Sequence, residues 1–292
     1  MTKPQHIVFA KPQHHYQSYD DFWALVTAAQ FPVVRLPEVD LSTETTYVFT
    51  PWNGEVADLL PQMHEKNGGK RRARVIWWNL ERDLADASDE DRVARLDKII
   101  RPAGDADHAP LVDEIWVSDR AYAALDDRFR HVILGGHPGF ADLRSVLFRR
   151  PQWLATLYAY VWGRRQMIVD DLTRHGISLS PNAWTFEDRA AVLSGSRLMV
   201  NTHQYDAART IAPIRFAVAA SYGMGLVSEP IDDPFPLIRN EHYAECATED
   251  LGRYLADFSG GAPAALATAP ALYDLLVDEY RFDREVRQAV GG

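Results

Sequence analysis

Arg74-Val-Ile-Trp-Trp78 is a short run of β-branched and aromatic residues with no polar residue between its four apolar positions. A run of this kind is typical of a strand that is buried on both faces of a parallel sheet. Similar runs recur on either side of it, at Ile7-Val-Phe-Ala10, Tyr47-Val-Phe-Thr50, Glu114-Ile-Trp-Val117 and His131-Val-Ile-Leu134. Stretches with helical periodicity, such as Asp20 to Ala29, lie between these runs. The alternation predicts an α/β unit whose parallel sheet is covered on both sides.

The same pattern restarts after Gly135-Gly-His-Pro-Gly139, which marks the expected boundary between two units. Strands are predicted at 154–161, 198–201 and 226–229. Helices are predicted at 165–175, 213–222 and 250–258, and a last helix from about Ala271 to Val290. The chain therefore divides into two open α/β units of similar size.

Composition and charge narrow the class of protein. The 292 residues include 31 Lys and Arg against 41 Asp and Glu, a formal net charge of −10, which argues against a broad basic surface for non-specific nucleic-acid binding. Cys246 is the one cysteine, so we expect no internal disulfide and no structural metal held by cysteines. We find no signal-peptide pattern and no run of about 18 apolar residues, and so expect a cytoplasmic protein without a membrane span.

Ligands of open parallel sheets bind outside the carboxyl ends of the strands, so the residues after each strand are the functional candidates. In the first unit these are His14, His15, Asn53, Glu81 and His137. His14 or His15 is placed to act as a general base toward an acceptor hydroxyl. Paired histidines also suit a metal, but no third ligand has a recognisable spacing. Glu81 either lines a cleft or acts as a cap. His137, in the loop between the units, would face the cleft from one side and is the third catalytic candidate.

In the second unit, Gly163-Arg164-Arg165 follows a strand and opens a helix. Two cations at the positive end of a helix are unfavourable without an anion, so we expect a phosphate-binding site rather than a solvated helix start. The segment lacks the glycine spacing of a dinucleotide fingerprint or a P-loop. The other candidates at strand ends or just beyond them are Asn201, His203, Arg209, Arg215 and Glu229.

Two of these candidates have alternative interpretations. His203 is placed to donate to a phosphate or sugar oxygen, or it is an ordinary satisfied turn residue. Glu229 is suited to accept bonds from ribose or sugar hydroxyls, or it is a surface charge before Pro230.

Two further sets of residues are interpreted as structural. The stretches Asp89-Glu-Asp91 and Asp105-Ala-Asp107 have the composition of a metal-binding motif, but neither directly follows an apolar strand. We interpret them as loop acids and expect no metal and no cofactor. Trp77, Trp78 and Trp116 lie inside strands and are expected in the core rather than at a stacking surface.

The order of these motifs resembles the two-domain nucleotide-sugar glycosyltransferases of GT-B architecture, in particular the group-1-like family. The resemblance covers residues 74–237 and rests on these segments: Ile76-Trp-Trp-Asn-Leu-Glu81, Ile115-Trp-Val-Ser-Asp119, Val132-Ile-Leu-Gly-Gly-His-Pro138, Gly163-Arg-Arg165, Leu198-Met-Val-Asn-Thr-His203, Pro213-Ile-Arg-Phe216 and Gly223-Met-Gly-Leu-Val-Ser-Glu229. One departure lies in the helix predicted at 213–222, which is rich in small residues. Many relatives carry a Glu at the start of this helix, where this chain has Phe216-Ala-Val218.

The resemblance implies two Rossmann-like lobes that face each other across a cleft. Residues 1–140 would form the acceptor lobe, with Asn53 and Glu81 on the acceptor side. Residues 141–270 would form the donor lobe, and the helix of 271–292 would pack back on the N-terminal lobe. Arg164 or Arg165 would neutralise the departing diphosphate, His203 and Arg215 would assist, and Glu229 would contact the donor.

The predicted function is metal-independent transfer of a sugar from a nucleotide-sugar donor to an unidentified acceptor. A glycan, a small molecule, a protein and a modified DNA base all remain open as acceptors. The alternatives are a nucleotide-sugar epimerase or hydrolase on the same scaffold, and a non-catalytic protein that binds nucleotide or sugar.

Overall fold

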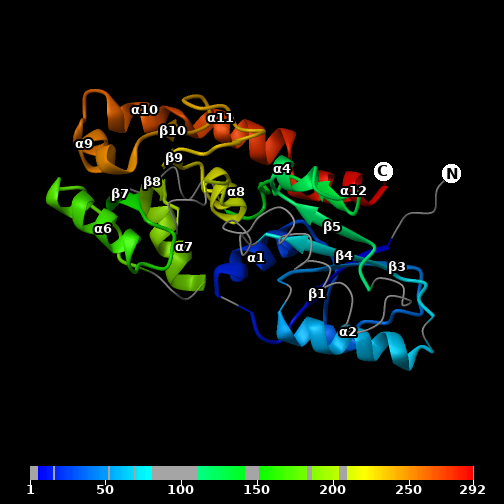
Figure 1. Ribbon diagram of the computed structural model, residues 1–292. Coiled ribbons are helices and arrows are strands. Elements are labelled where there is room, and N and C mark those ends of the chain that lie inside the picture. Colours follow the sequence, from blue (N-terminus) through cyan, green and yellow to red (C-terminus); the bar gives the residue numbers. More distant parts are fainter. Residues whose placement is uncertain are drawn as a thin grey trace. The chain divides into compact units, whose positions relative to one another are not determined.

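The computed structural model describes residues 6–15, 17–51, 53–68, 70–80, 111–141, 151–182, 186–203 and 209–291 (Figure 1). The chain forms two compact units. The first comprises 1–19, 29–132 and 283–292, and the second comprises 20–28 and 133–282. Residues 20–28 thus belong to the second unit, and the C-terminal segment belongs to the first.

The first unit contains a parallel six-stranded sheet in the order β2-β1-β3-β4-β5-β6. Its strands are β1 (His6–Lys11), β2 (Val33–Arg35), β3 (Thr45–Phe49), β4 (Arg74–Asn79), β5 (Glu114–Val117) and β6 (Phe129–His131). Its helices are α2 (Gly54–Lys66), α4 (Arg120–Ala123), α12 (Phe282–Gly291) and the 3-10 turns Gln17–Tyr19 and Leu36–Glu38.

The apolar runs that predicted this sheet form its core. Alternate residues along β3 and β4, such as Phe49 and Trp77, face a cluster that also holds Val56 and Leu60 of α2. Trp78 and Trp116 are fully buried and meet edge to face with ring centroids 5.2 Å apart. Trp77 is also buried, so the prediction that the strand tryptophans are core residues is confirmed. Buried rings offer no surface on which a ligand can stack.

Two arginines attach the C-terminal helix to this unit. Arg74 Nη1 donates to the carbonyl of Val290 at 2.8 Å, and Arg130 Nη1 donates to the carbonyl of Ala289 at 2.6 Å. The last carbonyls of a helix have no intrahelical partner and carry partial negative charge, so guanidinium groups stabilise them.

The second unit contains a parallel four-stranded sheet in the order β10-β9-β8-β7. Its strands are β7 (Trp153–Thr156), β8 (Ser196–Asn201), β9 (Gly225–Ser228) and β10 (Ala244–Glu245). Its helices are α1 (Asp20–Ala28), α6 (Arg164–Arg174), α7 (Phe186–Gly195), α8 (Pro213–Ser221), α9 (Leu251–Ala256), α10 (Gly261–Ala267), α11 (Ala269–Tyr273), a π-helical segment (Asp274–Glu279) and a 3-10 turn (Thr248–Asp250).

Apolar side chains cover both faces of this second sheet. Leu198 and Val200 of β8 pack with residues of α6, α9 and α10, whereas Met199 packs with α8 and the π-helical segment. This alternation along one strand is the period of two that places successive side chains on opposite faces. The predicted class, α/β with two parallel sheets, is confirmed.

Two predicted elements are shorter or more broken than expected. The strand expected at 154–161 ends at Thr156. The helix expected from Ala271 to Val290 is interrupted at Tyr280, where the Phe282 amide donates to the carbonyl of Gly136 at 3.0 Å instead of continuing the helix. Because this bond leads to a residue far away in sequence, local periodicity does not reveal it.

Candidate functional site

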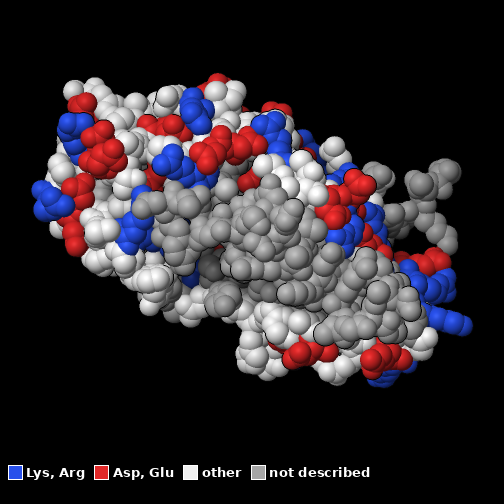
Figure 2. Space-filling model, viewed as in Figure 1, with Lys and Arg blue, Asp and Glu red and all other residues white. Residues whose placement is uncertain are grey.

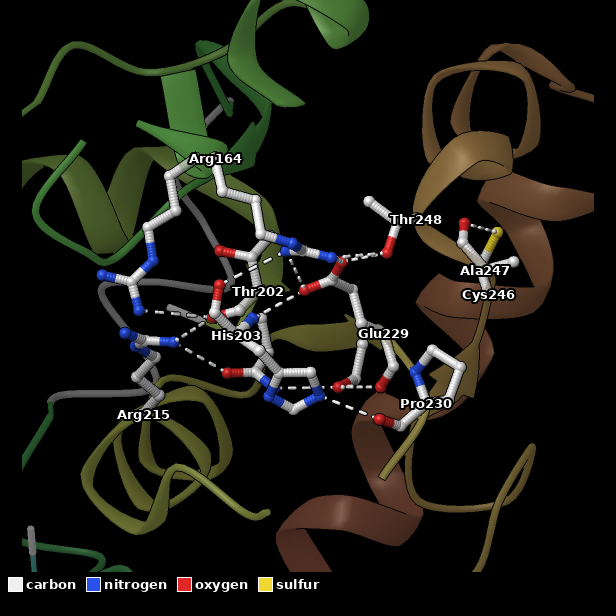
Figure 3. A network of polar contacts seen from close by, with 12 residues as sticks. Arg164, Thr202, His203, Arg215, Glu229, Pro230, Cys246, Ala247 and Thr248 are labelled. Atoms are coloured by element: carbon white, nitrogen blue, oxygen red, sulfur yellow. Dashed lines mark hydrogen bonds and ion pairs between the residues drawn. The ribbon is translucent and has the colours of Figure 1, made fainter. Parts of the chain in front are cut away.

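Polar residues of the second unit gather where its four parallel strands end (Figure 3). Arg164 follows β7, the segment Asn201-Thr202-His203 ends β8, and Glu229 follows β9. Thr248 lies beyond β10. Carboxyl ends of parallel strands share one edge of the sheet, and this is the edge at which such sheets bind ligands.

The start of α6 is set by Gly163. Its backbone has φ +54°, in the left-handed region that favours glycine, and an added Cβ would meet open space. Arg164 is therefore the first residue of the helix, and its side chain extends toward the ends of β8 and β9 (Figure 3). The sequence motif was interpreted as a phosphate site because two cations occupy this helix start.

Arg164 is paired with Glu229 in a two-point ion pair. Arg164 Nη1 donates to Glu229 Oε2 at 2.9 Å, and Arg164 Nη2 donates to Glu229 Oε1. The second hydrogen of each terminal nitrogen also has a partner, the His203 carbonyl at 3.3 Å and Thr248 Oγ1 at 2.8 Å. The protein itself thus supplies an anion for one of the two cations.

The carboxylate of Glu229 receives four hydrogen bonds. Besides the two from Arg164, the Thr248 hydroxyl donates to Oε1 and the His203 backbone amide donates to Oε2 at 2.6 Å. Glu229 is 1 % exposed, and burial alone would raise the pKa of its carboxyl group. The bonds from Arg164, Thr248 and His203 outweigh burial and hold that pKa below its ordinary value. Glu229 is therefore ionised at neutral pH.

Two further guanidinium groups meet at one backbone oxygen. Arg215 Nη1 donates to the Thr202 carbonyl at 2.9 Å and to Asn201 Oδ1 at 2.9 Å. Arg165 is buried, and its Nη2 donates to the same Thr202 carbonyl at 3.4 Å. Like charges held this close favour the binding of an anion beside them.

Asn201 and His203 are fixed by neighbouring strands. Asn201 Nδ2 donates to Ser228 Oγ at 2.8 Å, which joins the ends of β8 and β9. His203 Nε2 lies 2.8 Å from the Pro230 carbonyl, and because a carbonyl only accepts, Nε2 carries the proton. Arg209, also predicted for this site, has an exposed side chain, and its carbonyl accepts from Asp232 N at 2.9 Å.

The predicted residues of the first unit form a separate group at the ends of β1 and β3. Asn53 caps α2 by accepting from Val56 N at 3.1 Å, and its Nδ2 donates to the His14 carbonyl at 2.6 Å. Glu55 accepts from the backbone amides of Gln13 and His14 at 2.8 and 3.2 Å. The loop that carries His14 and His15 is thus attached to the start of α2, with the His14 side chain exposed.

The remaining predicted residues lie elsewhere. His137 belongs to the second unit, where its Nδ1 accepts from Gly139 N at 3.1 Å and its amide donates to Ser221 Oγ at 3.3 Å. Glu81 and the two Asp-x-Asp stretches lie outside the described residues. Among the residues that are described, we find no group of three or more His, Cys, Asp or Glu side chains that could hold a metal ion.

Sequence reasoning missed several polar residues of the second unit. Thr248 follows a two-residue strand that is too short to show a pattern. Asp21 is buried, and its Oδ2 accepts from Arg189 Nε at 2.9 Å and from the Tyr158 hydroxyl. Burial raises the pKa of Asp21, although the bonds from Tyr158 and Arg189 oppose this. Three residues so far apart in sequence give no local signal.

Comparison with known proteins shows the fold. No protein-family model matches the chain, and no curated protein matches it either. The solved structure of TarM aligns with TM-score 0.51 and 10 % identity, over 86 % of this chain and 55 % of TarM. This likeness agrees with the predicted GT-B-like α/β fold.

Two other solved structures align less closely. The Glycosylation Associate Protein (Gap123) complex from Streptococcus agalactiae gives TM-score 0.45 and 12 % identity, over 87 % of this chain and 55 % of that one. An alpha1,3-fucosyltransferase gives TM-score 0.42 and 10 % identity, over 90 % and 80 %. The chain therefore spans little more than half the length of TarM and of the Gap123 chain.

The described surface and helices add two observations. On the face drawn in Figure 2, the described Lys and Arg side chains are interspersed with Asp and Glu side chains. Within the described ranges, every helix falls short of the length and apolar character that a bilayer crossing requires.

Proposed function

We propose that this protein is a glycosyltransferase that moves a sugar from a nucleotide-sugar donor to an acceptor without a metal ion. The observation that carries the proposal is the gathering of three arginines at the carboxyl ends of one parallel sheet: Arg164 is paired with Glu229, and Arg165 and Arg215 both donate to the Thr202 carbonyl. Three guanidinium groups against one carboxylate give this cluster excess positive charge in a chain whose net charge is −10. A diphosphate is the anion that this position and charge suit best.

The chemistry follows from the charge that develops during transfer. When the bond between the sugar and the diphosphate breaks, negative charge grows on the leaving oxygen, and fixed guanidinium groups stabilise it. Asn201 and His203 lie beside these groups and complete the proposed donor site, and exposed Arg209 would reach the donor from its rim. In the first unit, His14 or His15 would accept the proton of the acceptor hydroxyl, with Asn53 and Glu81 on the acceptor side. His137 is the remaining candidate for a proton-transfer role.

The GT-B-like fold supports this proposal, since the chain aligns with TarM at a TM-score of 0.51. Fold alone does not define a reaction. The proposal therefore rests on the arginine cluster. We also propose a cytoplasmic location, because a chain with a single cysteine suits a reducing compartment.

The test is a turnover assay with UDP, GDP, ADP, dTDP and CMP sugars, each with and without a mixture of glycan and small-molecule acceptors. We expect one donor to release its nucleotide faster when acceptor is present, with no change on addition of EDTA. Equal consumption of the donor without acceptor would indicate a hydrolase or epimerase instead. Binding without any consumption would indicate a non-catalytic protein.

A further inference from the structure

The guanidinium group of Arg164 is already engaged within the protein. Both terminal nitrogens of Arg164 have each of their hydrogens bonded to the protein, to Glu229, the His203 carbonyl and Thr248. A phosphate oxygen can take one of these hydrogens only if an internal bond is first broken. Arg164 is therefore poorly suited to bind a ligand, in spite of its place at a helix start.

The same reasoning applies to Glu229. A carboxylate has about four acceptor positions, and the four donors from Arg164, Thr248 and His203 use them. Separating a buried ion pair leaves an uncompensated charge, which is strongly unfavourable. Glu229 is thus not placed to accept hydroxyl groups of a ribose or a sugar, the role that its position after β9 suggested.

The Arg164–Glu229 ion pair and its hydrogen-bond partners connect the ends of four strands. Arg164 lies after β7, His203 after β8, Glu229 after β9 and Thr248 after β10. The His203 segment is held from both sides, because its amide donates to Glu229 and its carbonyl accepts from Arg164. Thr202, whose carbonyl orients Arg215, is the preceding residue.

We infer that Arg164 and Glu229 are positioning residues that form a neutral internal pair, and that Arg215, which shares the Thr202 carbonyl with Arg165, makes the contact with the donor's phosphates. This inference rests on the proposed function and assigns roles within the same site. Arg215 lies in the first turn of α8, where the positive end of the helix adds to its charge.

The test compares three variants with the wild type by calorimetric titration, with inorganic pyrophosphate and with whichever of UDP, GDP and ADP binds the wild type. Glu229→Gln removes a buried negative charge and leaves the charge of Arg164, so we expect both probes to bind at least threefold more tightly. The double variant Arg164→Met with Glu229→Gln restores the net charge and should bind both probes within twofold of wild type. Arg215→Gln should weaken both by at least tenfold.

Other roles give different patterns. If Glu229 accepts a ribose hydroxyl, Glu229→Gln weakens the nucleotide and leaves pyrophosphate unchanged. If Arg164 contacts phosphate, the double variant weakens both probes by tenfold or more. Either pattern would overturn the inference. If the single variants fail to fold, the test uses the double variant and Thr248→Val. Thr248→Val keeps both charges of the pair and should bind both probes within twofold of wild type.

Thermal unfolding separates this inference from the proposed function. Arg164→Met and Glu229→Gln should each lower the Tm by roughly 5–15 °C, because each leaves a partner uncompensated. The double variant should lose less than the two losses added together. If the wild type binds no probe, the proposed function fails, but the Tm values still test the Arg164–Glu229 pair. Strictly additive losses of Tm would overturn the inference that the two residues form an internal pair.

Discussion

Arg215→Gln is the substitution most directed at ligand binding. The Arg215 guanidinium is oriented by two bonds from Nη1, to Asn201 Oδ1 and to the Thr202 carbonyl, each 2.9 Å long. Because the side chain starts from the third residue of α8, a bound phosphate would also experience the positive end of that helix. Glutamine removes the charge and keeps a polar group of intermediate length.

The magnitude follows from the type of bond that is lost. A hydrogen bond between a guanidinium and a phosphate contributes about 1.5–3 kcal/mol. The Kd of the nucleoside diphosphate should therefore rise about 10- to 150-fold. Loss of the two internal bonds should cost about 2 kcal/mol of stability, which lowers the Tm by only some degrees and leaves the variant folded at 25 °C.

The assay is calorimetric titration at 25 °C of the nucleoside diphosphate that stabilises the wild type most. Arg174→Gln is the matched control, since it removes the same charge from the last turn of α6, where the side chain is 72 % exposed. We expect the control to bind within twofold of wild type. Unchanged binding in Arg215→Gln, or an equal loss in Arg174→Gln, would refute the assignment.

Two further substitutions test the packing of the second unit. Gly135→Ala should destabilise the protein by about 3 kcal/mol or more in urea unfolding, because the added Cβ would lie 1.6 Å from the Tyr280 carbonyl oxygen. Gly54→Ala is the control and should not destabilise the protein, because its added Cβ would have nothing within 4 Å. Equal effects of the two substitutions would contradict this prediction. Arg189→Met should cost about 3–5 kcal/mol at pH 7 by stranding the buried Asp21 carboxylate. Burial raises the pKa of Asp21, so protonation of its carboxyl group stabilises the variant as the pH falls. The loss of stability should therefore be smaller at pH 5 than at pH 7. An equal loss at both pH values would argue against the ion pair of Asp21 with Arg189.

Most strands and helices were predictable because they depend on local patterns, whereas the short strands β2 and β10 were not predicted, and β6 (Phe129–His131) lies before the run expected at 131–134. The run at Arg74–Asn79 is apolar on both sides of the pleat, and only a sheet covered on both faces accommodates it. The start of α6 was predictable to within one residue, since Gly163 supplies the left-handed turn. Strand ends then indicated where Asn201, His203 and Glu229 would gather.

The partners within the site were not predictable from the sequence. Arg164 and Glu229 are 65 residues apart, and nothing in either segment shows that they pair. A cationic helix start favours a nearby anion, but the sequence does not specify whether that anion is a ligand or a side chain. Asp21 and Arg189, 168 residues apart, show the same dependence on tertiary structure.

The central claim is that the strand ends of the second unit bind a nucleotide-sugar donor without a metal ion. The most direct measurement is the thermal stabilisation of the purified protein by UDP, GDP, ADP, dTDP and CMP sugars, with and without EDTA. The account predicts a rise in Tm that is selective for one nucleotide and unchanged by EDTA. No rise with any donor, or a rise only when a divalent metal is present, would contradict it.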